Sequence, residues 1–231
     1  MSPLDLVLIV VRNLGDLRER VAFVGGAVRG LLITDPGAPA ERPTDDVDLI
    51  VELTSAAEFH RLGNELEARG FKVDSRPGAP ICRRVVAGVT VDVMPTHGSV
   101  LGFTNRWYPQ ALANAMVVEA HGERFRIVDG PHFCATKLES FADRGLDEDD
   151  QRNWYHHDLE DVVALVDGRQ ELIAEVANAD QNVRRYITEQ VQKLLDTPAF
   201  MEALPGHLAG DSASQARVPL VVERLRALTK V

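Results

Sequence analysis

The sequence predicts an α+β protein, in which a small mixed sheet flanked by helices is followed by an α-helical C-terminal region. Two observations lead to this class. Short apolar, β-rich runs separated by glycine and proline turns alternate with helical patterns up to residue 130, and from Pro131 onward the periodicity is helical. We therefore expect two domains, a core of residues 1–130 and a helical region of residues 131–231.

The N-terminal part predicts alternating helices and strands. Leu6, Val10 and Leu14 recur at helical spacing, so the first element should be an amphipathic helix. The elements expected here are a helix over residues 4–19, a buried strand over 21–24, a turn at Gly25-Gly26, a helix over 27–33, an exposed loop with three prolines over 34–44, and a strand over 46–52.

A capping box and a glycine stop mark the next helix. Ser55 is followed three residues later by Glu58, and Gly70 follows the last apolar residue. The elements expected beyond it are strands over residues 71–74, 81–87, 90–94 and 125–128, turns at Pro77-Gly78 and Ala87-Gly88, and an irregular segment around Trp107 and Tyr108.

The C-terminal region predicts helices throughout. Pro131 suits a helix start and Gly145 a helix end. The elements expected are helices over residues 131–144, 156–166, 170–195 and 218–229, an acidic loop over 145–153, and a small, polar, mobile linker over 205–217.

Composition excludes several classes of protein. The chain has 231 residues, of which 45% are hydrophobic, and this is enough for a real core. No apolar run approaches the roughly 18 residues of a membrane span, and the start lacks the basic residues of a signal peptide. Two cysteines, Cys82 and Cys134, give neither a disulfide framework nor a zinc pattern. We therefore expect a cytoplasmic protein with no membrane partner.

The net charge of −10 argues against tight, non-specific binding of long nucleic acid, which needs a basic face. A local basic patch formed by Lys72, Arg76 and Arg83-Arg84 is compatible with this charge, and so is a cationic small-molecule substrate.

Three aspartates predict a metal site. Asp46 and Asp48 lie two apart in a β-rich run, so their side chains point to the same face. Carboxylates held side by side repel each other unless a cation lies between them, and a divalent cation with oxygen ligands is the usual solution. Asp92 adds a third carboxylate in another β-rich run, where an acid needs a partner. The alternative is a turn with an Asx-type bond.

Gly25-Gly26 stands between a strand and a helix and predicts an anion site. Glycine lets phosphate oxygens approach the backbone, and the free amides of a helix start favour negative charge. Arg29 lies one turn into this helix and is either a phosphate contact or a surface arginine. An ordinary strand-to-helix turn is the alternative for the glycine pair.

Together, Gly25-Gly26, Arg42-x-Thr44-x-Asp46-x-Asp48 and Asp92 resemble the nucleotidyltransferase fold of the DNA polymerase β superfamily. The branch most similar is the bacterial AbiEii-like group, which includes the MenT toxins and also carries a helical lysine followed by an aspartate. Here Lys137 is followed 21 residues later by Asp158. The resemblance covers roughly residues 20–168, and the loop over 34–43 is longer than in the shortest members.

The resemblance implies a nucleotidyltransferase core and Mg²⁺-dependent transfer of a nucleoside monophosphate from an NTP to an acceptor hydroxyl. The site residues that it implies are the ligands of two Mg²⁺ ions, Asp46, Asp48 and Asp92; the phosphate-binding residues Gly25, Gly26, Arg29 and Lys137; and Asp158, which orients Lys137 and completes the catalytic set with Lys137 and the three metal ligands.

Two questions stay open in the helical region. Asp161 lies one helical turn after Asp158 and is the alternative partner of Lys137, and Lys137 itself is either a phosphate ligand or a solvated surface lysine. The neighbouring pair His156-His157 does not predict a metal site, because adjacent residues on a helix do not face the same way.

The AbiEii-like branch implies a toxin-antitoxin system, with RNA such as the tRNA 3′ end as acceptor and an antitoxin as partner. Aminoglycoside and lincosamide nucleotidyltransferases share the glycine pair and the acidic motif, and their cationic acceptors suit the net acidity of this chain. A catalytically inactive nucleotide-binding module is the third hypothesis.

Overall fold

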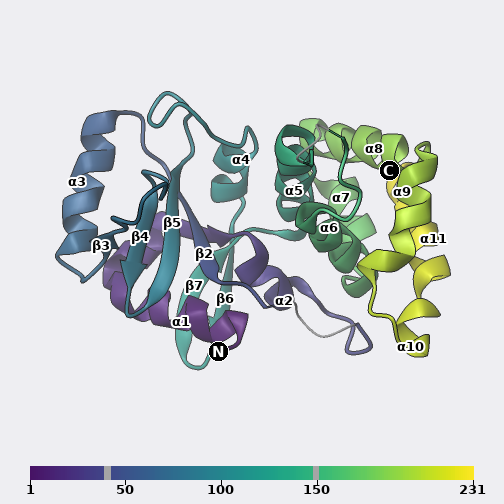
Figure 1. Ribbon diagram of the computed structural model, residues 1–231, viewed down its shortest axis with the longest axis horizontal. Coiled ribbons are helices and arrows are strands. Elements are labelled where there is room, and N and C mark those ends of the chain that lie inside the picture. The colour runs from purple at the N-terminus through teal and green to yellow at the C-terminus, as the bar shows by residue number, and fades with distance from the viewer. Residues whose placement is uncertain (39–42, 148–150) are drawn as a thin grey trace. The chain divides into compact units, whose positions relative to one another are not determined.

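The computed structural model describes residues 1–38, 43–147 and 151–231 (Figure 1). The chain divides into two compact units, which we call the sheet unit (Met1–Gly30 and Glu41–Asp129) and the helical unit (Leu31–Ala40 and Gly130–Val231). Arg42 and the middle of the expected loops, at residues 39–42 and 148–150, lie outside the described residues. The predicted α+β class is confirmed, with a mixed seven-stranded sheet, flanking helices and a mainly helical C-terminal region.

The sheet has the strand order β3-β4-β5-β2-β1-β7-β6. Its central pairs β2–β5 and β1–β7 are parallel, and β1–β2 and the outer pairs are antiparallel. The strands are β1 Val21–Val24, β2 Asp46–Val51, β3 Lys72–Val73, β4 Arg83–Val86, β5 Val89–Pro95, β6 Met116–Ala120 and β7 Glu123–Ile127. Of these, β6 was not expected from the sequence.

Alternation along the central strands separates the core from the candidate site. In β1 all four residues are buried, and Phe23 packs edge-on against Phe125 with ring centroids 5.4 Å apart. In β2, Val47 and Leu49 are buried, whereas Asp46 and Asp48, which alternate with them, are partly exposed. The apolar side chains therefore hold the strand in place while the two acids face away from them.

Short helices accompany the sheet. They are α1 Pro3–Leu14, the 3-10 helix η1 Gly15–Arg20, the 3-10 turn η2 Gly26–Val28, α2 Arg29–Leu32, α3 Ala56–Glu67 and α4 Tyr108–Ala113. The first helix is shorter than expected because Gly15 has a φ of 57°, which ends the α-helix and starts η1. The helix expected over residues 27–33 is instead a 3-10 turn followed by α2.

The caps of α1 and α3 differ from the expectation. Ser2 and Asp5 form a reciprocal capping box at α1 that was not predicted. At α3, Ser55 accepts from the Glu58 backbone amide as expected, but the Glu58 carboxylate binds the amide and hydroxyl of Thr54 instead of returning to Ser55. The predicted capping box is therefore half correct.

The helical unit contains α5 Gly130–Arg144, α6 His157–Gly168, α7 Leu172–Asn178, α8 Gln181–Leu195, α9 Pro198–Ala203, η3 Leu204–His207, α10 Ser212–Gln215 and α11 Val218–Leu228. The prediction of one long helix over 170–195 is wrong, because Asp180 caps α8 through the Asn182 amide and separates it from α7. The mobile linker over 205–217 is also wrong, since Asp211 caps α10 through two amides.

Residues 31–38 belong to the helical unit and are fixed to it by polar contacts. The amides of Thr34 and Asp35 both donate to the Gly168 carbonyl at 2.9 Å. Arg169 donates to the Leu32 carbonyl at 2.7 Å, and Arg217 donates to the Asp35 carboxylate at 2.7 Å. The helical unit is thus assembled from two separate stretches of chain.

A membrane-crossing helix would have to be both long and apolar, and none of the helices in the described residues meets both conditions.

Candidate functional site

The three predicted metal ligands converge on two neighbouring strands of the sheet unit. Strands β2 and β5 are parallel and in a register that places Asp48 beside Asp92, and Asp46 lies on the same face as Asp48. One carboxylate oxygen from each residue lies within 4.8 Å of the other two. We call Asp46, Asp48 and Asp92 the acidic triad.

The lead-in to the triad orders its first member. The Thr44 hydroxyl lies 3.3 Å from Asp46 Oδ1 and also contacts the Asp46 carbonyl at 3.5 Å. Threonine at this position therefore limits the orientation of the Asp46 carboxylate, whose side chain is 40% exposed.

Arg83 is a member of the site that the sequence analysis missed. It donates to both oxygens of Asp92, at 2.8 and 2.7 Å, and lies 3.7 Å from Asp46 Oδ2. The hydrogen bond with Asp92 raises the pKa of the Arg83 guanidinium above its ordinary value. The sequence carried a signal for this contact: a two-residue turn at Ala87-Gly88 pairs Val86 with Val89, and the same register places Arg83 opposite Asp92.

The basic patch suggested for Lys72, Arg76 and Arg83-Arg84 does not form as expected. Arg84 is buried and donates to the carbonyls of Ile81 and Arg83. Arg76 binds Asp74, and this hydrogen bond lowers the pKa of Asp74 to about 2. Since Arg83 is bound to the triad, three of the four cations are committed to local partners.

Gly25 lies against the triad and needs to be glycine. Its φ is 73° and its ψ is −170°, a combination that residues with a Cβ avoid. A Cβ built on Gly25 would lie 2.0 Å from Asp48 Oδ2. Gly26 begins the turn η2, and Arg29 is buried, so the alternative of Arg29 as a surface arginine is wrong.

Cys82 lies beside the triad, and its environment disfavours the reactive thiolate. Burial raises the pKa of its thiol to about 11, and the negative charge of Asp92 acts in the same direction. Cys134 is fully buried, and burial raises its pKa to about 12. Both cysteines are free, as the absence of a disulfide framework in the sequence indicated.

Lys137, in α5, is buried between two aspartates of α6. Its Nζ lies 3.2 Å from Asp158 Oδ1 and 2.6 Å from Asp161 Oδ2, and 5.8 Å from the ring centre of Phe133. The alternative of a solvated surface lysine is therefore wrong. Both Asp158 and Asp161 contact Lys137, so the geometry favours neither of them as its functional partner.

Several cationic or neutral groups surround the buried carboxylate of Asp158. Arg144 donates to both oxygens of this carboxylate, from Nε to Oδ2 at 3.1 Å and from Nη2 to Oδ1 at 3.3 Å, and so shares Oδ1 with Lys137. Burial alone would raise the pKa of Asp158, but the charges of Lys137 and Arg144 outweigh it, and the pKa is lowered. Asp158 is therefore ionised at neutral pH and serves as the counterion of two cations.

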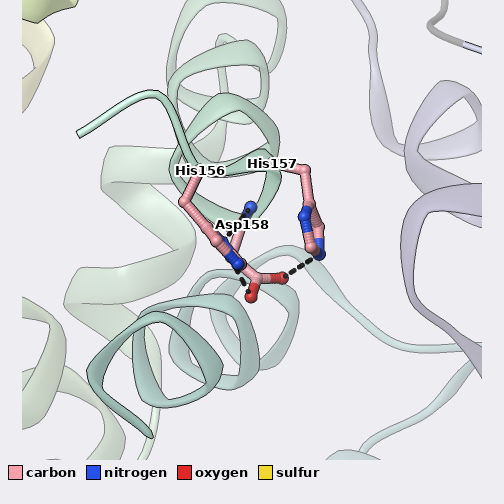
Figure 2. A group of neighbouring side chains, drawn as sticks. All are labelled: His156, His157 and Asp158. Atoms are coloured by element: carbon pink, nitrogen blue, oxygen red, sulfur yellow. Dashed lines mark hydrogen bonds and ion pairs between the residues drawn. The ribbon is translucent and has the colours of Figure 1, made fainter. Parts of the chain in front are cut away.

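His156 and His157 flank the Asp158 carboxylate, as Figure 2 shows. Their ring nitrogens lie 3.4 and 3.7 Å from its two oxygens, and the three residues could in principle share a metal ion. The argument that adjacent helical residues diverge does not apply, because His156 is the extended N-cap residue of α6. Lys137 and Arg144 already occupy the same carboxylate, however, and their charges oppose a divalent cation there.

The predicted catalytic residues thus form two clusters: the acidic triad in the sheet unit, and Lys137 with Asp158 in the helical unit. The solved structures to which the chain is similar include the following two. One is an antigenic nucleotidyltransferase-like protein from Paracoccidioides brasiliensis, with a TM-score of 0.48 and 20% identity over 86% of this chain and 91% of that one. The other is JHP933 from Helicobacter pylori, with a TM-score of 0.46 and 10% identity over 98% of this chain and 90% of that one.

Both TM-scores lie below 0.5, where a likeness of this kind does not establish a common fold. No protein-family model matches the sequence, and no curated protein is similar to it. The chemistry of the chain therefore has to be argued from the residues of the site.

The donor set of the triad fits a hard divalent cation. Carboxylate oxygens are the ligands that Mg²⁺ prefers, and three of them lie within reach of one ion. Arg83 does not block this, because an ionised carboxylate has about four lone-pair sites and the bidentate contact uses two of those on Asp92. Three carboxylates and one guanidinium leave a surplus of negative charge for a cation to balance.

Proposed function

We propose that this chain is a Mg²⁺-dependent nucleotidyltransferase, which moves a nucleoside monophosphate from an NTP to an acceptor hydroxyl. The observation that carries the proposal is the convergence of Asp46, Asp48 and Asp92 from two parallel strands to within 4.8 Å. Bound Mg²⁺, two ions as the sequence resemblance implies, would neutralise the triphosphate and lower the pKa of the attacking hydroxyl.

In this proposal the residues of the sheet unit have different roles. Asp46 and Asp48 would hold the metal, and Asp92 would be the third ligand and is the candidate general base. Arg83 holds Asp92 in one orientation through two hydrogen bonds. Gly25 and Gly26 allow phosphate oxygens to approach the backbone, and Arg29 is the candidate phosphate contact.

The roles of Lys137 and Asp158 stay predictions that rest on the sequence resemblance. Lysine suits the grip on a triphosphate, because its ammonium is a compact point charge. In the structure Lys137 is held by Asp158 and Asp161, which is consistent with a positioned lysine and equally with a structural ion pair. Kinetic measurements on variants of this pair distinguish the two roles.

Two classes of acceptor are proposed. The AbiEii-like resemblance favours RNA, such as the tRNA 3′ end, and would make the chain the toxin of a pair with an antitoxin partner. The second candidate is a cationic small molecule of the aminoglycoside or lincosamide type, and the net charge of −10 favours it because an acidic protein attracts a cationic acceptor.

The test is transfer from each of the four labelled NTPs in the presence of Mg²⁺, with total tRNA and a panel of aminoglycosides as acceptors. Asp48→Asn should reduce transfer by roughly 100-fold or more, because charge stabilisation at the reacting phosphate is lost. Asp45→Asn is the matched control, since Asp45 is an exposed neighbour outside the triad.

Mg²⁺-dependent NTP binding without transfer to any acceptor would identify the chain as an inactive nucleotide-binding module. Transfer by Asp48→Asn within a few-fold of the wild-type rate would contradict the metal assignment. Absence of both binding and transfer would overturn the proposal as a whole.

A further inference from the structure

We propose that the sheet unit holds a second ligand site, which binds a small organic monoanion, a carboxylate on an apolar body. The site is a cavity of about 480 Å³ at the carboxyl ends of β2 and β5, lined by residues of the sheet unit alone. Cavities of this size are typical of small-molecule sites. It is distinct from the acidic triad, none of whose members lines it.

Strand geometry places the cavity away from the triad but on the same face of the sheet. Thr96 and Glu52 follow β5 and β2 at the positions that continue the alternation of Asp92 and Asp48. Each lies four residues beyond its aspartate, so the separation along the strand is roughly 13 Å. A ligand in the cavity therefore does not need the metal or the nucleotide for its own contacts.

Thr96 brings a buried, unsatisfied hydroxyl to the wall of the cavity. Thr96 lines the cavity and is 3% exposed, and its Oγ1 has no hydrogen-bond partner among the residues that the structure describes. The Thr96 backbone is fixed, because its amide donates to the Val51 carbonyl at 3.0 Å. Leaving a buried hydroxyl unpaired costs stability, so an oxygen supplied by a ligand would be favoured here.

The charge of the cavity favours an anion. Arg126 lines it, and the partners found for this guanidinium in the described chain are two backbone carbonyls, those of Leu112 at 2.6 Å and Glu19 at 3.4 Å. Its charge is thus not balanced by a carboxylate in a direct contact. Arg20 also lines the cavity but is paired with Glu65 at 2.9 Å. A carboxylate ligand can take the remaining N–H groups of Arg126.

The other lining residues define the rest of the ligand. Val51, Pro109, Leu112 and Ala113 form an apolar wall, which suits an apolar body and gives no contact to bare phosphate. Glu52 contributes one negative charge to the same cavity and disfavours a dianion. A monoanionic carboxylate therefore fits better than a phosphate ester.

The test uses benzoate as the probe, with benzyl alcohol as a neutral analogue and phenyl phosphate as the dianion. Binding is followed by NMR of the Val51, Leu112 and Ala113 methyl groups, with EDTA present so that the triad plays no part. We expect millimolar benzoate to shift these methyl signals and to leave those of Val191 and Leu228 in the helical unit unchanged. Benzyl alcohol should bind about tenfold more weakly.

Two variants assign the contacts. Thr96→Val keeps the side-chain volume, removes the hydroxyl, and should weaken benzoate binding about three- to tenfold. Arg126→Lys keeps a cation and should weaken it less than Arg126→Met. Arg12→Met and Thr197→Val are the matched controls, since neither residue lines the cavity.

Three results would overturn the proposal. The first is equal affinity for benzoate and benzyl alcohol, which would show that the negative charge plays no part in binding. Phenyl phosphate could bind more tightly than benzoate, which contradicts the monoanion. Finally, millimolar benzoate could leave the cavity methyl signals of the folded wild-type protein unchanged, a result that needs no variant and is independent of nucleotidyl transfer.

Discussion

At the scale of single residues, the acidic triad depends on one backbone position that carries no side chain. Gly25 has a φ of 73° and leaves no room for a Cβ, which would lie 2.0 Å from Asp48 Oδ2. Asp48 therefore fills the space that any other residue at position 25 would need. The glycine is required by both its backbone conformation and its neighbour, and these two requirements can be separated by experiment.

We predict that Gly25→Ala destabilises the protein and displaces Asp48. Backbone strain in this region of φ and ψ costs about 1–3 kcal/mol, and the contact with Asp48 adds to it. The free energy of unfolding in urea and Mn²⁺ binding by calorimetry should both fall. Gly15→Ala is the control, because Gly15 also has a positive φ but no atom within 4 Å of its Cβ position. If both variants lowered the free energy of unfolding equally and left Mn²⁺ binding intact, Gly25 would serve the turn alone and not the triad.

At the scale of elements, the β4–β5 hairpin and the α5–α6 pair each bring charged partners together. The hairpin register pairs Arg83 with Asp92, and α5 and α6 bury Lys137 against Asp158 and Asp161. Both sets of partners are on neighbouring elements in sequence, but their contacts depend on pairing and packing. The ion pairs therefore report on whether these elements are correctly docked.

We predict that Lys137→Met destabilises the helical unit by about 3–5 kcal/mol, because it leaves Asp158 and Asp161 buried with one cation fewer. Adding Asp158→Asn should cost less than it does in the wild-type background, since the two residues act as a unit. Urea unfolding measures the stability, and kcat/KM for NTP transfer is measured on the same variants. Lys193→Met, on the exposed face of α8, is the control. Additive losses would mean that Lys137 and Asp158 act independently.

We predict that the helical unit loses stability between about pH 7.5 and pH 5.5. Burial lowers the pKa of both His156 and His157 below the ordinary 6.5. As the pH falls through 6.5, the two histidines therefore bind protons in the unfolded chain but stay neutral in the folded chain, and the free energy of unfolding falls. The contribution of Asp158, whose pKa is lowered, is present above its ordinary 3.8 and is lost only as the pH falls through its lower folded value.

The double variant His156→Gln/His157→Gln should flatten this dependence in urea titrations at the two pH values. A residual slope is expected from His207, whose pKa is also lowered by burial. An unchanged slope in the double variant would show that the two histidines are as accessible to protons in the folded chain as in the unfolded one.

The elements also differ in how well the sequence predicts them. Local signals predicted β1, β2, β4, β5 and the convergence of Asp46, Asp48 and Asp92, because alternation and short turns fix which side chains share a face. The same signals failed for α7 and α8, where Asp180 could have been read as either a helix-surface acid or a cap. They also missed β6, although His121 and Gly122, both with positive φ, close a two-residue hairpin turn before β7.

At the scale of the whole molecule, the two units are interleaved along the chain. The predicted division into residues 1–130 and 131–231 does not include Leu31–Ala40 in the helical unit. No local pattern in that loop indicates where it docks, because its anchors are residues far away in sequence: Gly168, Arg169 and Arg217. Long-range contacts of this kind depend on the folded structure and cannot be derived from spacing.

We predict that Arg217→Met destabilises the helical unit by more than about 2 kcal/mol, since it removes the partner of the buried Asp167 and of Asp35 at once. Urea unfolding gives the loss, and limited proteolysis should show faster cleavage within residues 34–38. Arg12→Met is the control, because its exposed pair with Glu123 should contribute less than about 1 kcal/mol. If residues 34–38 were cleaved no faster in the variant than in the wild type, Arg217 would not be needed to hold this loop.

The interleaving also sets an order of events during synthesis on the ribosome. Residues 31–38 emerge early, but Gly168, Arg169 and Arg217, to which they bind, are translated well over 100 residues later, a delay of several seconds to tens of seconds at roughly 5–20 residues per second. During that interval the segment has no docking surface while the strands around it can already pair. Residues 31–38 must therefore stay undocked until Gly168, Arg169 and Arg217 have all been synthesised.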